Sequence, residues 1–215
     1  MSHCYIFKDD ILQFARKEKI GQAVLVSYMR FIYRYVVQQG RQNKFLFVNP
    51  NIVATQGSSF DDHVQNLFRR CNDVKSKEQV MLVPWNHGEH WMLLILAPYA
   101  YNVYCCDPVN SELNNREEIV SVIVSAFNLF FSMNLPDVEI PDTLRIKQPQ
   151  CPHQPDNVAC GYYLMRMLKD LIEHASPGHF LRTLTSTSYT EAQIDELRQE
   201  WATYMLPIIQ SYQPR

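Results

Sequence analysis

The sequence predicts an α+β protein in which a central mixed or antiparallel sheet is flanked by helices. Two observations carry this prediction: helical patterns stand at both ends of the chain, and the apolar runs between them are strand-like. Helices that precede and follow a block of strands, rather than alternate with it, are typical of the α+β class. With 215 residues, of which 47% are hydrophobic, the whole chain, 1–215, is expected to form a single domain.

The N-terminal part, 1–75, is expected to be mainly helical. Apolar residues recur at three- and four-residue steps over 9–39, and the charged run 17–19 interrupts them, which predicts two helices. A short strand over 45–48 follows, and then a third helix over 60–71, whose first turn carries two aspartates.

The middle part, 76–175, is expected to hold the sheet. Residues 80–84 and 90–96 are apolar on both faces, as in strands of a covered sheet, and 101–107 runs back as a third strand. The other elements expected here are an amphipathic helix over 115–133, an edge strand over 143–147, a loop over 151–159 and a helix over 160–173.

The C-terminal part, 176–215, is expected to form one helix. The turn residues Ser176-Pro177-Gly178 should end the preceding helix. Thr190 and Gln193 have the spacing of a capping box, which predicts a final helix that runs through Met205 and is interrupted at Pro207.

The bulk composition excludes several classes of protein. A net charge of −2 gives no general attraction to nucleic acid or to a membrane surface. Six irregularly spaced cysteines do not form a disulfide scaffold, and no apolar run approaches the ~20 residues of a membrane span. The first five residues carry no signal-peptide pattern. The cysteine usage therefore predicts an intracellular, reducing compartment. We also expect the protein to be a monomer and to act in the nucleus or cytoplasm.

The most informative pattern is a hairpin that brings a histidine and an aspartate together. If Leu96 pairs with Tyr101 across the four-residue loop 97–100, His90 lies opposite Asp107. Directly opposed residues share one face of the sheet, with Cβ atoms about 4.5–5.5 Å apart. The Asp107 carboxylate can then accept a hydrogen bond from the imidazole of His90 and support its protonated form.

A cysteine at the start of a helix completes a nucleophilic arrangement. Cys160 opens the predicted helix, where the positive end of the helix dipole favours the reactive thiolate. Gly161 follows it and leaves room for a substrate carbonyl near the Cys160 N–H group. Gln154 stands six residues upstream in a proline-bounded loop, and its amide could donate a second hydrogen bond to an oxyanion.

Each of these residues alone has a more ordinary interpretation. A buried cysteine is usually an inert small hydrophobe, and an aspartate before proline usually serves a turn. Cys105 and Cys106 are interpreted in that way, as residues of the core. Cys151-Pro152-His153 has no second matching pair, so we expect no metal site. The order of histidine, aspartate, glutamine and cysteine is far more specific than any one of them.

That order resembles the ubiquitin-like-protein-specific cysteine peptidases, which include the SUMO proteases and the adenovirus-protease relatives, and within them the divergent plant members. The similarity runs from about residue 80 to 171 and looser similarity precedes it. The residues that match are the general base and its neighbour in His90-Trp91, the acidic residue Asp107, the oxyanion residue Gln154, and the nucleophile with its glycine in Cys160-Gly161.

The resemblance implies a papain-like cysteine protease fold with rearranged element order, and a cofactor-free catalytic core in 76–175. It implies a cysteine peptidase or isopeptidase that cleaves after the glycine-rich tail of SUMO, ubiquitin or a related modifier, with Trp91 and Gly161 beside that tail. The chain departs from the family at Ala159, where aspartate is common, and in having no tryptophan before Trp85.

Two other functions stay open at this point. Relatives of this fold use the same three residues to transfer acetyl groups, although that group usually carries glutamate where this chain has Asp107. The chain could also be a non-catalytic module that binds a ubiquitin-like protein. The intact set of His90, Asp107, Gln154 and Cys160 favours an enzyme.

Overall fold

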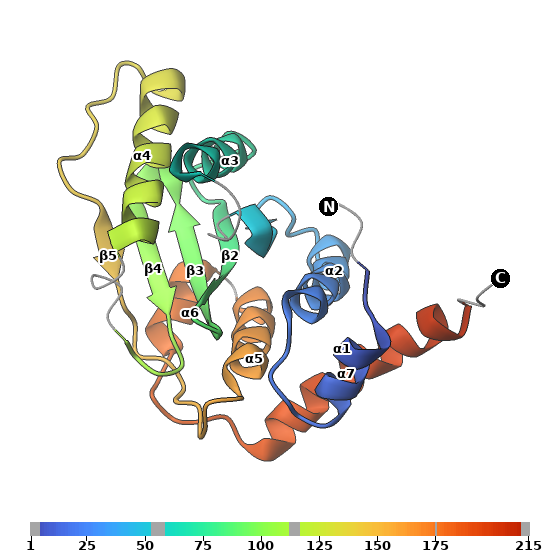
Figure 1. The fold of residues 1–215 in the computed structure, drawn as a ribbon. Coiled ribbons are helices and arrows are strands. Elements are labelled where there is room, and N and C mark those ends of the chain that lie inside the picture. Colours follow the sequence, from blue (N-terminus) through green and yellow to red (C-terminus); the bar gives the residue numbers. More distant parts are fainter. Residues whose placement is uncertain (1–4, 53–58, 112–116, 175, 212–215) are drawn as a thin grey trace.

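In the computed structural model, a five-stranded sheet lies between two groups of helices (Figure 1). The structure describes residues 5–52, 59–111, 117–174 and 176–211. The strands lie in chain order; the inner pairs are antiparallel and the two outer pairs parallel, so the sheet is mixed and the predicted α+β class is confirmed. The strands are β1 (Phe45–Phe47), β2 (Val80–His87), β3 (His90–Ala97), β4 (Asn102–Cys106) and β5 (Arg145–Lys147).

Most of the expected helices are present. The predicted break after the first N-terminal helix and the predicted start of a helix at Cys160 are both confirmed. In the described ranges, no helix combines the length and the apolar character needed to cross a membrane. The helices are α1 (Lys8–Ala15), α2 (Gln22–Gln38), α3 (Phe60–Asn72), α4 (Glu117–Asn134), α5 (Cys160–Glu173), α6 (Pro177–Thr183) and α7 (Glu191–Ser211), with 3-10 turns η1 (Pro50–Ile52) and η2 (Pro98–Ala100).

The C-terminal part differs from the expectation of a single interrupted helix. Helix α5 already ends at Glu173, and the residues expected to end it begin α6 instead, because the Ser176 hydroxyl accepts the His179 N–H (3.2 Å) and Pro177 occupies the first turn. The Thr190–Gln193 capping box is confirmed, but α7 continues through Pro207. This end of α7 extends away from the sheet and is exposed, so the hydrogen bond lost at proline is not needed for packing (Figure 1).

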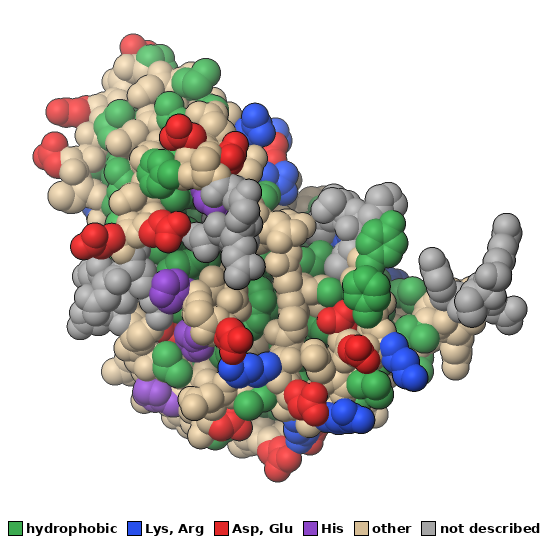
Figure 2. Space-filling view, viewed as in Figure 1, with side chains coloured by type: hydrophobic (Ala, Val, Ile, Leu, Met, Phe, Trp, Pro, Cys, Tyr) green, Lys and Arg blue, Asp and Glu red, His purple; other side chains and the backbone are tan. Residues whose placement is uncertain are grey.

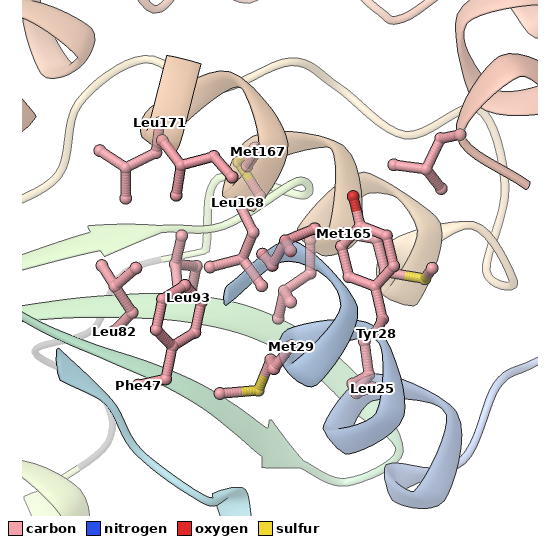
Figure 3. Close-up of a cluster of buried hydrophobic side chains, with 14 of the residues drawn as sticks. Leu25, Tyr28, Met29, Phe47, Leu82, Leu93, Met165, Met167, Leu168 and Leu171 are labelled. Carbon is pink, nitrogen blue, oxygen red and sulfur yellow. The ribbon is translucent and has the colours of Figure 1, made fainter. Parts of the chain in front are cut away.

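Strand β3 supplies side chains to two separate cores. Leu93 and Ile95 belong to a cluster formed with α2 and α5, part of which is drawn in Figure 3. Met92 and Leu94 belong to the second cluster, which α3 and α4 cover. Since alternate residues of a strand point to opposite faces, a run that is apolar at every position requires cover on both sides. The sheet is therefore held between two layers, and the ends of its strands are fixed in position.

The register of the β3–β4 hairpin differs from the prediction. The connection has the expected length of four residues, but it starts one residue later, so Ala97 pairs with Asn102 and Leu96 with Val103. The physical cause is the turn η2, in which Tyr101 adopts a left-handed conformation (φ 50°) and donates its N–H to the Pro98 carbonyl. The predicted direct pairing of Leu96 with Tyr101 is wrong, and each β3 residue meets a partner two positions further along β4.

Candidate active site

The ends of three secondary-structure elements meet at one end of the sheet. These are the start of β3, the end of β4 and the N-terminus of α5 (Figure 1). The β2–β3 connection is the two-residue turn Gly88-Glu89, and both residues have positive φ, as in the type I′ turn that suits a tight hairpin. This turn places His90 at the first position of β3, beside the loop that follows β4.

The predicted contact between histidine and aspartate is present. Nε2 of His90 lies 2.7 Å from Oδ1 of Asp107, within hydrogen-bond distance. The two residues are diagonal rather than opposite, since the ladder between β3 and β4 begins at Leu93 and Cys106. Their contact survives the error in register because a shift of two positions leaves both side chains on the same face.

Asp107 is a buried carboxylate with a full set of partners. It is 2% exposed, and its Oδ1 also accepts the N–H of Val109 at 3.0 Å. Its Oδ2 accepts both the N–H (3.2 Å) and the hydroxyl of Ser111. Burial raises the pKa of Asp107, but the hydrogen bonds from His90, Ser111 and Val109 outweigh it, so the carboxyl pKa is lowered. Sequence reasoning missed Ser111, because no pattern links a serine to an aspartate four residues earlier across a proline.

His90 also contacts the cysteine at the start of α5. Burial lowers the pKa of His90, but its hydrogen bonds to Asp107 and Cys160 raise it to about 9. Burial likewise disfavours the Cys160 thiolate, yet hydrogen bonds from His90 and from the Trp91 and Gly161 N–H groups lower the pKa of the thiol. The thiolate–imidazolium pair is therefore favoured from below the ordinary cysteine pKa up to about pH 9.

Cys160 differs in this respect from two other buried thiols, those of Cys71 and Cys106. Burial raises the pKa of Cys71 well above its ordinary value, and contact with Cys151 together with burial does the same for Cys106. Both side chains lie in the apolar cores, as does Cys105, in agreement with the expectation for the β4 cysteines. The pKa of the Cys160 thiol is thus lowered, whereas those of the Cys71 and Cys106 thiols are raised.

The residues beside the two reactive groups pack against the N-terminal segment. The indole N–H of Trp91 donates to the Ile20 carbonyl (3.0 Å), and Trp91 is 6% exposed. A Cβ on Gly161 would overlap Cγ1 of Ile20 and lie 2.8 Å from its Cδ1. Gly161 therefore has a packing function, which is to let the segment before α2 approach the first turn of α5.

Gln154 lies in a loop that is tied to the end of β4. Its N–H donates to the Pro108 carbonyl (3.0 Å), which joins this loop to the one carrying Asp107. Its side-chain amide donates to the Asp156 carbonyl within its own loop, and its Oε1 is buried with no hydrogen-bond partner among the described residues. The Gln154 amide would have to turn away from Asp156 to reach an oxyanion at Cys160.

The carboxylate of Asp156 accepts hydrogen bonds from the backbone just before α5. Its Oδ1 accepts the N–H groups of Val158 (2.8 Å) and Ala159 (2.9 Å). The N–H groups of Cys160 and Gly161 follow in the first turn, where the helix dipole favours negative charge. In the part of the chain that the structure describes, no three metal-ligating side chains are grouped to hold an ion.

Comparisons with known proteins agree with this arrangement. A family model described as the Ulp1 protease family, C-terminal catalytic domain, matches residues 18–211. A search of curated proteins gives no match.

Three solved structures illustrate the structural similarity. A de-sumoylating protease has a TM-score of 0.70 at 13% identity, covering 98% of this chain and 92% of that chain. The Ulp1 protease domain in complex with Smt3, the yeast ortholog of SUMO, has a TM-score of 0.62 at 15% identity, covering 96% of this chain and 85% of that chain. The Xanthomonas campestris effector XopD bound to ubiquitin has a TM-score of 0.60 at 16% identity, covering 86% of this chain and 91% of that chain. At such low identity these similarities show the fold, and the predicted papain-like arrangement with rearranged element order is confirmed by them together with the family match.

Titration of the Cys160 thiol tests the electrostatic description. The thiolate absorbance of the wild-type protein, corrected with Cys160→Ser, should rise with a midpoint below the ordinary cysteine pKa of about 8.5. His90→Ala should move this midpoint upward, because burial then acts without the opposing imidazolium. An unchanged midpoint in His90→Ala would contradict the His90–Cys160 contact.

Proposed function

Since the chain belongs to the Ulp1 protease family and is a cysteine protease, we propose that it cleaves the bond after the glycine-rich C-terminal tail of a ubiquitin-like modifier, SUMO or a relative. The observation that carries this proposal is the imidazole of His90, held between the buried carboxylate of Asp107 and the thiol of Cys160. Similar structures hold Smt3 in one case and ubiquitin in another, which supports the substrate class.

In the proposed reaction, the Cys160 thiolate attacks the carbonyl carbon of the last tail residue. The carbonyl electrons move to oxygen, and the Cys160 N–H and the Gln154 amide stabilise that oxyanion. His90 donates its proton to the leaving amine as the intermediate collapses to a thioester. His90 then takes a proton from water as the water attacks the thioester. Collapse of this second intermediate releases Cys160 as the thiolate beside the imidazolium of His90, and the modifier as a carboxylic acid that loses its proton to solvent.

Asp107 acts through His90 rather than on the substrate. Its Oδ1 holds Nε2 of His90, so that the other ring nitrogen is directed to Cys160, and its charge stabilises the imidazolium. Ser111 is a positioning residue for this carboxylate, since its hydroxyl and N–H fix Oδ2.

The site suits a tail without side chains. Trp91 has its ring edge near the Cys160–Gly161 turn, where Cδ1 is 3.5 Å from the position that a Gly161 Cβ would occupy. We propose that glycines in the substrate pass beside this ring, and that the enzyme acts inside the cell, in the nucleus or cytoplasm. The described cysteines are all free thiols, which fits a reducing compartment.

A panel of ubiquitin-like proteins with C-terminal electrophiles tests the substrate class. We expect at least one member to form a thioether or thioester adduct at Cys160 and none to react with Cys160→Ala, because the electrophile occupies the position of the scissile carbonyl. The matched control is Cys71→Ala, which removes a buried thiol of the α3 core and should retain the adduct if folded. The same modifiers with dialanine tails should react far more slowly; equal rates would remove the argument for a glycine-specific channel.

Gln154→Ala tests the oxyanion assignment. Loss of one oxyanion donor costs about 10²–10³ in rate in other enzymes. We expect kcat to fall towards the lower part of that range with KM little changed, because the Gln154 amide must first release the Asp156 carbonyl. A raised KM at constant kcat would make Gln154 a binding residue.

Ser111→Ala tests the support of Asp107. A hydrogen bond to a charged group contributes on the order of 1.5–3 kcal/mol, so kcat should fall roughly tenfold or more while KM stays constant. Ser111→Thr, which keeps the hydroxyl, should retain most of the activity. In an Asp107→Asn background, itself lower in kcat, Ser111→Ala should have little further effect; additive losses would show that Ser111 acts elsewhere.

A further inference from the structure

The nucleophile of this protease is covered. Cys160 is only 2% exposed, whereas a scissile carbonyl must approach its sulfur directly. The side chain of His90 is 20% exposed, so the covered region is the turn of α5 that carries the cysteine rather than the whole site. Some part of the cover has to move before a substrate tail reaches Cys160.

Two segments far apart in the sequence meet beside this turn. Lys19 directly precedes Ile20, which packs on Gly161, and Glu89 directly precedes His90, which contacts Cys160. Nζ of Lys19 forms an ion pair with Oε2 of Glu89 at 2.9 Å. Figure 2 shows acidic, basic and histidine side chains gathered on the face of the molecule over this end of the sheet. The ion pair thus joins the segment before α2 to the tip of the β2–β3 hairpin, and each partner is adjacent in sequence to a residue that lies against the first turn of α5.

The surroundings of Cys160 differ in how easily they can move. Ile20 and Trp91 are 4% and 6% exposed and belong to the core, so displacing them disrupts packing. The side chains of Lys19 and Glu89 are 49% and 80% exposed and are held to each other. An exposed ion pair contributes little to stability and exchanges readily with solvent. Of these contacts near Cys160, the ion pair is therefore the one that can open at low cost.

We propose that the Lys19–Glu89 ion pair is a strap across the approach to Cys160, which a substrate tail displaces when it binds. The proposal rests on the proposed function only in naming a protein tail as the group that enters. The hydrogen bond that Lys19 donates to Glu89 is the main cause that raises the pKa of Lys19, and the charge on Cys160 raises it further, so the ion pair lies close enough to the thiolate for their charges to interact. Opening the strap exposes the nucleophile and leaves a cation beside it.

Alkylation by iodoacetamide tests the strap without any ubiquitin-like substrate. The rate at Cys160, located by peptide mass spectrometry, is measured against pH; its plateau reports access to the thiolate and its midpoint reports the thiol pKa. Lys19→Glu and Glu89→Lys each place like charges together, so both plateaus should rise, by roughly two- to fivefold given the weakness of exposed pairs. The exchanged double variant, with both substitutions, should return to within about twofold of the wild type because the opposite charges are restored.

Ionic strength and a neighbouring lysine provide the controls. Salt at about 1 M screens exposed charges over a few ångströms, so it should raise the wild-type plateau but not those of the single variants. Lys17 forms ion pairs with Glu191 and Asp195, which are residues of α7. The control substitution Lys17→Met should therefore leave the plateau of the alkylation rate unchanged. Equal plateaus in the wild type and both single variants, or a double variant that stays as fast as the singles, would overturn the strap. If the variants alkylate as expected but no modifier forms an adduct, the proposed substrate class would be rejected and the proposed strap would be retained.

Discussion

The buried carboxylate of Asp107 is the constraint on which the site depends. An ionised group that is 2% exposed is costly unless hydrogen bonds and an opposite charge compensate it. Asp107 obtains this compensation from Val109 and Ser111 in its own loop and from the imidazole of His90. Because the loop supplies donors to both oxygens, the carboxylate is held in one orientation. Its hydrogen bond to Nε2 then orients the imidazole ring of His90.

From Asp107 the same electrostatic effect extends through His90 to Cys160. Support from the carboxylate raises the pKa of His90, and the charged imidazole in turn lowers the pKa of the Cys160 thiol. The first turn of α5 adds its N–H groups to this effect. Strands and a helix, held by two packed cores, fix all three groups before substrate binds, so little reorganisation is needed during the reaction.

Packing and access are separate properties of the segment before α2. Ile20 is fixed, because it fills the space that a glycine leaves on α5 and its carbonyl accepts the Trp91 indole N–H. Its neighbour Lys19 is held only by an ion pair on the surface. In the proposed opening, one rigid residue and one movable residue, adjacent in sequence, would let His90 and Cys160 stay in place while the approach to them widens.

The sequence determined which chemical groups this protein brings to the end of its sheet. The loop-to-helix change at Cys160 was readable from prolines and apolar periodicity, and the His90–Asp107 contact could be predicted despite a wrong register because side chains in a strand repeat every two residues. Only the tertiary structure decided how those groups are supported and covered: the hydroxyl of Ser111 on Asp107, the approach of Ile20 to Gly161, and the ion pair between Lys19 and Glu89. These contacts depend on the paths of loops or join segments distant in the chain, and no local periodicity or propensity encodes which distant side chain will lie there.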